Sequence, residues 1–311
     1  MRSRRALALS LLALLLAAAI ASTAGAQGIR PAPGAPDPRQ IVLTAADLGG
    51  AKVVGQGYYR ERDVPSVISY AREFENGRSQ GTRFLSVDSA ADVGVDAETT
   101  AQFLSTLRRA LATNQGRALF KRAITSSLPK DGVATNVQVG RPRALGLGPD
   151  AFDLLVTFRL LGLRTEIHLT MFAVERALGT ITSLGLPGSR IARAQLLRLG
   201  RLMSARMTTQ LTPRNTALPA ITGVAHDTAT LTASTGTWSG APTTFTYQWQ
   251  RCDAAGANCA DVVGATAATY LVTTAEVGTT LRVTVTGQNG VAATAAVSAQ
   301  TPVVLAATPA P

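Results

Sequence analysis

The chain has 311 residues, of which 46% are hydrophobic, and its mean hydropathy is +0.17. These values allow two ordinary domains with packed cores and exclude a chain that is disordered throughout. The formal net charge is +11, from 30 basic and 19 acidic side chains. A positive field of this kind favours anionic polymers or lipid headgroups as partners. Only Lys52, Lys121 and Lys130 are lysines, so an arginine-rich codon usage is an alternative origin of the charge.

Residues 1–26 have the pattern of a cleavable signal peptide. Three arginines in the first five residues precede an apolar run over 6–21, and 24–26 read Ala-Gly-Ala, a small-residue cleavage site. The apolar run has about 16 residues, fewer than the roughly 20 that span a bilayer, so we expect cleavage and not a membrane anchor. General secretion is favoured over twin-arginine export. The mature protein is therefore expected to start near Gln27 and to be secreted, in the cell envelope or outside the cell.

The positive charge is concentrated in the middle of the chain. Without the three arginines of the signal, the net charge falls from +11 to +8. Residues 217–311 carry a net charge of −2, which leaves +10 on residues 27–216. Because nucleic acid does not fit with export, we expect an anionic polymer of the cell envelope, a protein or a lipid as the partner.

The region 27–211 predicts a leader followed by a mixed domain. Residues 27–40 contain four prolines and predict a disordered, solvated leader. Strands are expected at 52–62, 66–76, 82–88, 133–141, 151–160, 164–174 and 178–184, with helices beginning at Asp96, Arg117 and Ser189. Because the β-runs are joined by short turns and the helices are segregated from them, 41–211 is predicted to be an α+β antiparallel sheet domain with helices on one side.

The helix expected from Ser189 to about Thr209 is amphipathic. Its apolar stripe is predicted to cover one face of the sheet, and its arginines to be solvated. A helix of this kind can also lie on an anionic membrane surface. The arginines that we single out as candidate contacts to an anionic surface are Arg190, Arg193, Arg198 and Arg201.

Residues 212–219 are expected to form a polar, proline-bounded linker, and 220–304 an all-β immunoglobulin-like sandwich with a disordered tail at 305–311. The composition changes at this point to Thr, Ala, Val and Gly with few charges, and short alternating runs recur about every 10 residues, which is typical of a β-sandwich. Phe245, Tyr247 and Trp249 share one strand face. Trp249 is therefore the predicted anchor of the core.

Two segments carry a resemblance to a known family. GTWSGAPTTFTYQWQRC (236–252) and GANCADVVGATAATYLVTTAEVGTTLRVTVTGQN (256–289) resemble the immunoglobulin-like repeats of secreted and surface proteins of high-GC actinobacteria. The resemblance implies an extracellular spacer or adhesion module without catalytic residues. The cysteine pair that joins the two sheets of antibody domains is missing, so recognition through the end loops is not implied.

The two cysteines of the chain, Cys252 and Cys259, flank a six-residue loop. In an exported chain, an even pair at this spacing predicts a disulfide that closes a hairpin. A loop this short implies a stabilisation of about 2.5 kcal/mol in the chain-entropy model. A metal site is rejected because no histidine lies near enough in sequence to complete a tetrahedral set.

The middle domain resembles two kinds of extracytoplasmic domain. Its order of elements, its opening segment LTAADL (43–48) and its closing basic helix, Gln195 to Met207, resemble those of the PsbP-like lipoproteins and the sensor domains of mycobacterial serine/threonine kinases. This resemblance implies a curved sheet and a cavity or groove for a lipid or another apolar ligand. No individual residue can be assigned a role from it.

No catalytic constellation emerges from the sequence. His168 is the one histidine through which a Ser-His-Asp triad is conceivable, but no Gly-x-Ser-x-Gly motif is present. The carboxylate pairs Glu73 with Glu75 and Asp150 with Asp153 are the candidates for glycoside hydrolysis. Phosphate-binding loops, dinucleotide fingerprints and CxxC are missing from the sequence. We therefore expect no enzyme, no cofactor and no metal. A surface-interaction protein is the first hypothesis, and a carrier or sensor of an apolar ligand is the alternative.

Overall fold

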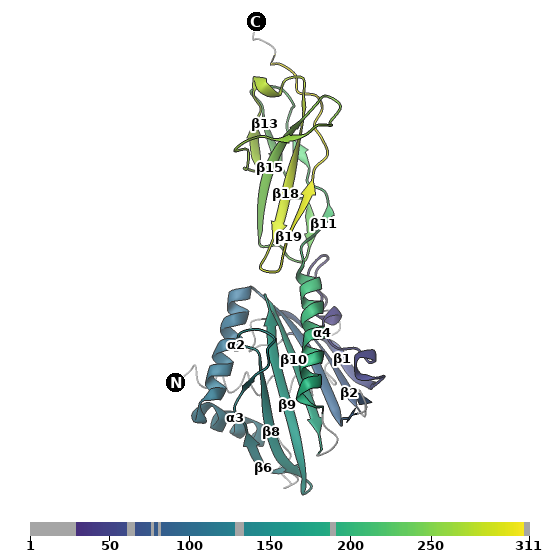
Figure 1. Ribbon diagram of the computed structural model, residues 1–311, viewed down its shortest axis with the longest axis vertical. Helices are drawn as coiled ribbons and strands as arrows, with labels where there is room; N and C mark the ends of the chain where they lie inside the picture. The colour runs from purple at the N-terminus through teal and green to yellow at the C-terminus, as the bar shows by residue number, and fades with distance from the viewer. Residues whose placement is uncertain are drawn as a thin grey trace. The chain divides into compact units, whose positions relative to one another are not determined.

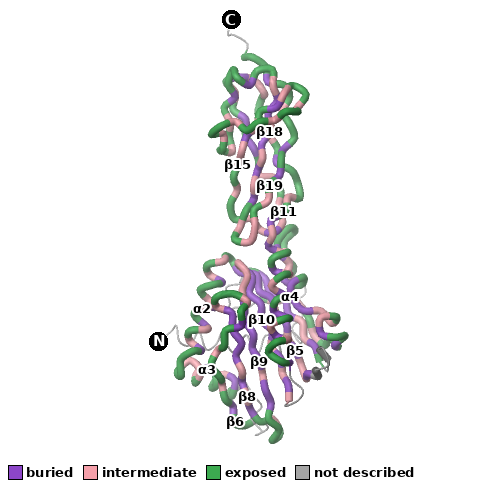
Figure 2. The backbone as a smooth tube through the Cα atoms, viewed as in Figure 1, coloured by how far each residue is buried: buried purple, intermediate pink, exposed green. Residues whose placement is uncertain are grey.

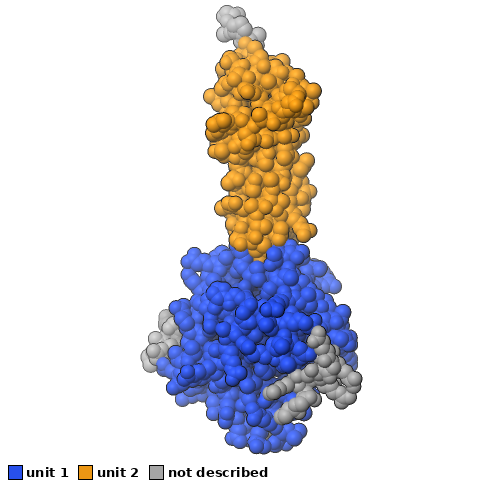
Figure 3. Space-filling model, viewed as in Figure 1, with its two compact units in different colours: residues 1–31, 37–210 blue, residues 32–36, 211–311 orange. Residues whose placement is uncertain are grey.

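The computed structural model describes residues 29–60, 66–75, 78–79, 82–127, 134–186 and 191–307. These residues form two compact units, coloured separately in Figure 3: 29–31 with 37–210, and 32–36 with 211–307. The predicted signal peptide, 1–26, lies outside the described residues, as do Arg190 and the last four residues of the tail.

The first unit is built on one antiparallel sheet (Figure 1). Its strand order is β1-β2-β5-β10-β9-β8-β6, and β7 pairs with β8. The strands are β1 (Lys52–Tyr59), β2 (Ser66–Glu75), β5 (Ser86–Gly94), β6 (Ala134–Val139), β7 (Arg143–Ala144), β8 (Phe152–Leu160), β9 (Leu163–Val174) and β10 (Ala177–Gly185), and β3 (Arg78–Ser79) with β4 (Thr82–Arg83) forms a separate pair.

Two consecutive helices, α2 (Ala97–Ala112) and α3 (Asn114–Ser127), cover one face of the sheet. Asp96 caps α2, since its side chain accepts a hydrogen bond from the backbone N–H of Thr99 at 2.6 Å. The apolar side chains of this layer are Leu104, Leu107, Leu111, Phe120 and Ile124 from the helices and Phe152, Leu154, Val156, Phe158, Leu169, Met171 and Leu178 from the strands. The helix predicted to begin at Asp96 is thus present.

The third helix, α4 (Arg193–Leu211), covers the opposite face of the sheet. Ser89 Oγ lies 3.3 Å from Met203 Sδ, and a Cβ at Gly179 would lie 2.6 Å from Met207 Cε. Gly179 and Leu178 are neighbours in β10 and point to opposite faces, and Leu178 belongs to the α2–α3 layer. The expectation of helices on one side only is therefore wrong. The physical reason is that the central strands are apolar or small on both faces, and both faces need cover.

Burial follows this three-layer arrangement, as Figure 2 shows for the central strands. On α4, the buried side chains include Leu196, Leu199, Met203 and Met207, so the apolar stripe predicted for this helix does pack on the sheet. Leu202 is only partly buried, and Ala192, which precedes α4, is exposed.

The segment before β1 is built into the first unit. It contains the 3₁₀ turns η1 (Pro38–Gln40) and η2 (Ala46–Leu48), and the apolar side chains between them are buried. Asp37 caps η1 and accepts a hydrogen bond from Tyr58 Oη at 2.8 Å. Pro38 is buried as well. The last residues of the expected disordered leader, 27–40, are therefore ordered, because the cap and the buried proline fix them to the sheet.

The second unit is all-β. Its sheets have the orders β11-β14, β12-β13-β17 and β16-β15-β18-β19. The strands are β11 (Arg214–Ala217), β12 (Ile221–Thr222), β13 (Thr230–Ala233), β14 (Thr237–Ser239), β15 (Thr244–Cys252), β16 (Ala260–Asp261), β17 (Thr269–Leu271), β18 (Thr280–Gln288) and β19 (Ala293–Val297), with η3 (Thr274–Glu276) before β18.

The core of the second unit lies between its three- and four-stranded sheets. Trp249 is fully buried there, its ring stacks on Tyr270 with centroids 5.5 Å apart, and its Nε1 donates to Ala267 O at 2.9 Å. Leu231 of β13 and Val283 of β18 belong to the same apolar cluster. The two sheets therefore share one core.

Two parts of the second unit differ from the sequence expectation. Residues 214–217, expected in a linker, form β11 and pair with β14. Leu305, expected in a disordered tail, donates its backbone N–H to Ala225 O at 2.9 Å. In both cases backbone pairing orders a segment whose side chains carry no strand pattern.

Candidate functional site

The exposed face of α4 is strongly basic. The helix carries four arginines and no acidic residue. Arg193, Arg198 and Arg201 are exposed on the side away from the sheet. Acids three or four residues from these arginines would stabilise the helix by forming ion pairs, and α4 has none. The structure thus places three of the four predicted contact residues on one helix surface, and the fourth, Arg190, lies outside the described part.

The fourth arginine of α4, Arg206, has a structural role. Its guanidinium lies 2.9 Å from a carboxylate oxygen of Asp47 and donates to Val42 O at 2.9 Å. Burial alone would raise the pKa of Asp47, but hydrogen bonds from Arg206 and Thr44 outweigh it and hold the pKa below 3.8. This pair fastens the segment before β1 to α4. Its charge is therefore neutralised internally, unlike that of Arg198 and Arg201.

A strip of polar side chains follows β8 and β9 on the same sheet face as α4. The register pairs Thr157 with Glu166, Arg159 with Arg164, and Asp153 with Thr170. These residues alternate with those that face α2 and α3, so all of them point to the α4 side. On this face the contacts of α4 reach β5, β10 and Phe172 of β9. The polar strip lies beyond them.

At one end of this strip, the side chains open into a polar pocket. Its volume is about 410 Å³. The lining residues come from β6, β8 and β9 and are Asn136, Gln138, Thr157, Phe158, Arg159 and Arg164. We call this the hairpin pocket, because Arg159 and Arg164 flank the turn between β8 and β9.

Farther along the strip, His168 and Asp153 form a buried pair. Nδ1 of His168 lies 3.0 and 3.1 Å from the two carboxylate oxygens of Asp153, and Thr170 Oγ1 donates to the same carboxylate at 3.4 Å. Ser183 of β10 is the register partner of His168. The structure thus brings a serine, a histidine and an aspartate to neighbouring strands, but within the described residues no hydrogen bond joins Ser183 to His168. The pair links β8 to β9 and satisfies two buried polar groups.

The two carboxylate pairs named as candidates for glycoside hydrolysis are Asp150 with Asp153 and Glu73 with Glu75, and the members of the first pair contact different residues. Asp150 lies 3.5 Å from Arg108, whereas Asp153 is bound to His168. Glu73 and Glu75 are two residues apart on β2. Burial, and then the charge of Glu75, raise the pKa of Glu73 above 4.5.

A third carboxylate, that of Asp88, lies beside Glu73 and is not among the residues predicted from the sequence. The two residues are register partners on β2 and β5, on the face that α2 and α3 partly cover. Burial, and then the charge of Glu73, raise the pKa of Asp88 from 3.8 to about 7. Its Oδ1 is buried without a hydrogen-bond partner. In the described parts of the chain, no group of three or more His, Cys, Asp or Glu side chains is arranged to hold a metal ion.

A smaller apolar pocket lies between α2 and the loop before β8. Its volume is about 240 Å³. Ala97, Ala101 and Leu104 of α2 face Ala151 and Ala173 across it, and Asp150 and Glu175 also line it. A pocket of this size accepts a small apolar group.

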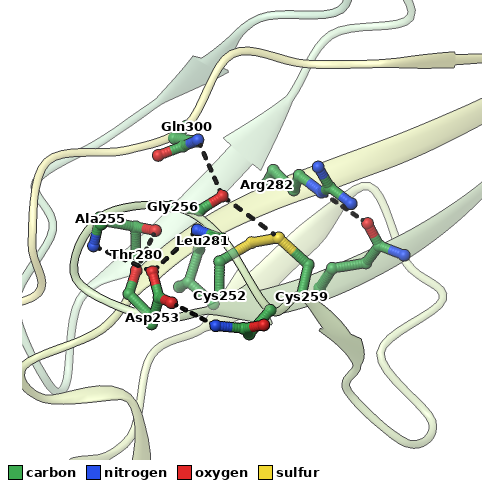
Figure 4. Close-up of a disulfide and its surroundings, with 12 residues drawn as sticks. Cys252, Asp253, Ala255, Gly256, Cys259, Thr280, Leu281, Arg282 and Gln300 are labelled. Atoms are coloured by element: carbon green, nitrogen blue, oxygen red, sulfur yellow. Dashed lines mark hydrogen bonds between the residues drawn. A yellow bond between two sulfur atoms is a disulfide. The ribbon is translucent and has the colours of Figure 1, made fainter.

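The disulfide of the second unit joins Cys252 to Cys259, as the sequence predicts (Figure 4). The loop between them is ordered by Asp253, whose carboxylate accepts hydrogen bonds from the N–H groups of Ala255 and Ala257 and from Asn258 Nδ2. Gln300 Nε2 donates to Gly256 O at 3.2 Å. These contacts and the disulfide hold the loop between the two cysteines in one conformation, which indicates a structural role for it.

Comparison with known proteins gives weak structural similarity. No family model matches the chain, and neither does any curated protein. Among solved structures, the extracellular domain of PknH from Mycobacterium tuberculosis covers 54% of this chain and 93% of its own, with 9% sequence identity and a TM-score of 0.37. This similarity provides no residue correspondence. No helix in the described ranges has the length and apolar character that crossing a membrane requires.

Sequence reasoning identified the α4 arginines but not the hairpin pocket. The signal was present in Arg159-Leu-Leu-Gly-Leu-Arg164, where two arginines are symmetric about Leu161 and Gly162. Both turn residues have positive φ, 50° and 79°, as a two-residue hairpin of the type I′ class requires. Recognising that turn would have placed the two arginines opposite each other.

Proposed function

We propose that the chain is a non-enzymatic binding protein that works outside the cytoplasm, and that its first unit binds an anionic partner of the cell envelope. The second unit is proposed to be an immunoglobulin-like module that presents the first. The observation that carries the proposal is the exposed face of α4, where Arg193, Arg198 and Arg201 have no acidic residue on the same helix.

The location is supported by the disulfide and by the proposed signal peptide. Disulfides persist in oxidising compartments and are rare in the cytoplasm. The module assignment is supported by the two sheets that share the Trp249 core and by the sequence resemblance at 236–289. A sandwich of this kind carries no chemistry of its own and serves as a spacer or adhesive element.

Retention of the mature chain on dextran sulfate beads tests this proposal, with neutral dextran beads as the reference. Retention should fall steeply as salt rises from about 0.1 M to about 1 M, where the Debye length shortens from about 10 Å to about 3 Å. Replacing Arg198 and Arg201 by Gln should weaken binding by about fivefold to thirtyfold, since an exposed charge contributes up to about 1 kcal/mol.

The matched control is Lys121→Gln with Arg122→Gln on α3, which removes the same charge from the opposite side of the sheet. This control should bind as the unmodified chain does. Equal losses in both variants would mean that only net charge matters, and binding that is unchanged at high salt would overturn the proposal.

The alternative function is an extracytoplasmic carrier or sensor of a lipid or other apolar ligand. The apolar pocket at α2 supports it, with its volume of about 240 Å³. Native mass spectrometry of the mature chain tests it. Co-purified lipid that is lost on Ala101→Glu, a change in the pocket wall, would favour the carrier over the polyanion-binding protein.

A further inference from the structure

The hairpin pocket holds two arginines that face each other across β8 and β9, and one of them, Arg164, also pairs with Glu166. Arg159 and Arg164 are register partners on β8 and β9. Like charges at directly opposed positions of an antiparallel pair repel each other. Arg159 Nη1 donates to Gly162 O at 2.9 Å, and Arg164 Nε lies 3.3 Å from Glu166 Oε1. A guanidinium has five N–H donors, so these contacts leave most donors of both side chains available.

The opposite wall of the pocket is shaped by a β-bulge in β6. The register between β6 and β8 shifts between Thr135 and Gln138, and Asn136 has a φ of 56°. Asparagine is one of the few residues that adopt this left-handed conformation readily. Bulges commonly re-aim a side chain beside a site, and here the bulge brings Asn136 into the lining with Gln138.

The lining defines a chemical class of ligand. The two guanidinium groups suit a carboxylate, whose planar geometry they can contact bidentately. The amides of Asn136 and Gln138 and the hydroxyl of Thr157 both donate and accept, as sugar hydroxyls do. The volume of about 410 Å³ is in the range of small-molecule sites.

We propose that the hairpin pocket binds an acidic sugar, with the uronate carboxylate held between Arg159 and Arg164 and the ring hydroxyls against Asn136, Gln138 and Thr157. The inference rests on the proposed binding function and names its ligand class. The pocket lies on the same sheet face as α4, so a polymer of uronate units could occupy the pocket while other units meet the arginines of the helix.

A ligand-observed NMR titration of the full mature chain tests the pocket. The probes are trigalacturonate, the corresponding neutral galactose trisaccharide and inorganic phosphate. Trigalacturonate should bind saturably, the neutral trisaccharide should not, and phosphate should bind more weakly than trigalacturonate. Replacing Arg159 and Arg164 together by Gln should weaken trigalacturonate binding by about tenfold or more, because charge-assisted hydrogen bonds are lost.

Two further variants separate the pocket from general charge effects. Gln138→Leu should weaken trigalacturonate binding and leave phosphate binding unchanged, since it removes a hydroxyl partner and no charge. Lys121→Gln with Arg122→Gln should change neither. Because Arg159, Arg164 and Gln138 are exposed, these variants should fold, which their thermal unfolding curves verify.

Several results would overturn the inference: phosphate or the neutral trisaccharide binding as tightly as trigalacturonate, or an unchanged affinity in the arginine double variant. The α4 variant then shows whether the proposed function fails with it. If Arg198→Gln with Arg201→Gln still loses retention on dextran sulfate, the polyanion-binding function stands and only the acidic-sugar assignment is wrong.

Discussion

Replacing Asp88 by Asn should stabilise the first unit at neutral and alkaline pH. Asp88 lies on β5 between Glu73 of β2 and Thr182 of β10, its register partners. Its Oδ1 is buried without a hydrogen-bond donor, and burial and then Glu73 raise its pKa from 3.8 to about 7. The charged carboxylate is therefore disfavoured in the folded chain, whereas the neutral amide of Asn carries no such penalty.

The direction and size of the effect of Asp88 on folding stability follow from proton linkage. Between about pH 4 and about pH 7 the folded chain keeps the proton on Asp88 and the unfolded chain loses it, so this group makes stability fall as pH rises. A rise of the pKa from 3.8 to about 7 corresponds to about 4 kcal/mol of lost folding stability above pH 7, at about 1.36 kcal/mol per pH unit. Since the side chain as a whole keeps some contact with solvent, this value is an upper limit.

Urea unfolding at about pH 4.5 and about pH 8 measures the effect. Both tryptophans, Trp238 and Trp249, belong to the second unit, so their fluorescence reports that unit, and far-UV circular dichroism also detects the first. The variant should be as stable as the unmodified chain at the acidic pH and more stable at the alkaline pH, with the fluorescence transition unchanged. Glu75→Gln, an exposed change on β2, is the control. If Asp88→Asn shows the same pH slope as the unmodified chain, the assigned burial of this carboxylate is wrong.

Three further changes test the packing. Gly179→Ala should destabilise the first unit by about 1–3 kcal/mol, because its Cβ would lie 2.6 Å from atoms of Met207 and Phe172. Gly57→Ala is the control and should cost nothing, because no atom lies within 4 Å of the added Cβ. Equal effects of the two changes in urea unfolding would argue against the packing of α4 on β10. Trp249→Ala should cost the second unit about 3–5 kcal/mol by the same assay, and a loss below about 1 kcal/mol would contradict its central position. Replacing Cys252 and Cys259 by Ser should lower the thermal stability of that unit by about 2.5 kcal/mol, and an unchanged midpoint would refute the cross-link's contribution.

The sequence predicts the elements of the first unit better than their layers. Periodicity and the Asp96 cap place α2, and the alternation in β8 and β9 places both strands. The second helical layer was missed because the strands carry small residues where α4 approaches them, among them Gly179 of β10 and Ser89 of β5. Close approach of a helix demands such residues, yet hydrophobicity patterns do not register them as core.

The candidate site was predictable only in part, for a related reason. Amphipathicity finds the α4 arginines directly, since they are close in sequence. The hairpin pocket depends on which residues face each other across strands, and the turn at Leu161 and Gly162 determines this for β8 and β9. The contribution of β6 could not be derived, because the bulge at Asn136 shifts its register relative to β8.

The two ends of the polar strip along β8 and β9 differ in how their polar side chains are paired. At the end next to β7, where Asp153 pairs with Arg143, the polar side chains are buried, and Asp153 and His168 satisfy each other. At the open end, Arg159 and Arg164 repel each other, and stability alone would favour an acid at one of the two positions. A protein tolerates such a local cost most readily where function needs the two positive charges side by side. This contrast within one strand pair, and not the overall basic charge, is the strongest reason to look for the ligand at the hairpin pocket.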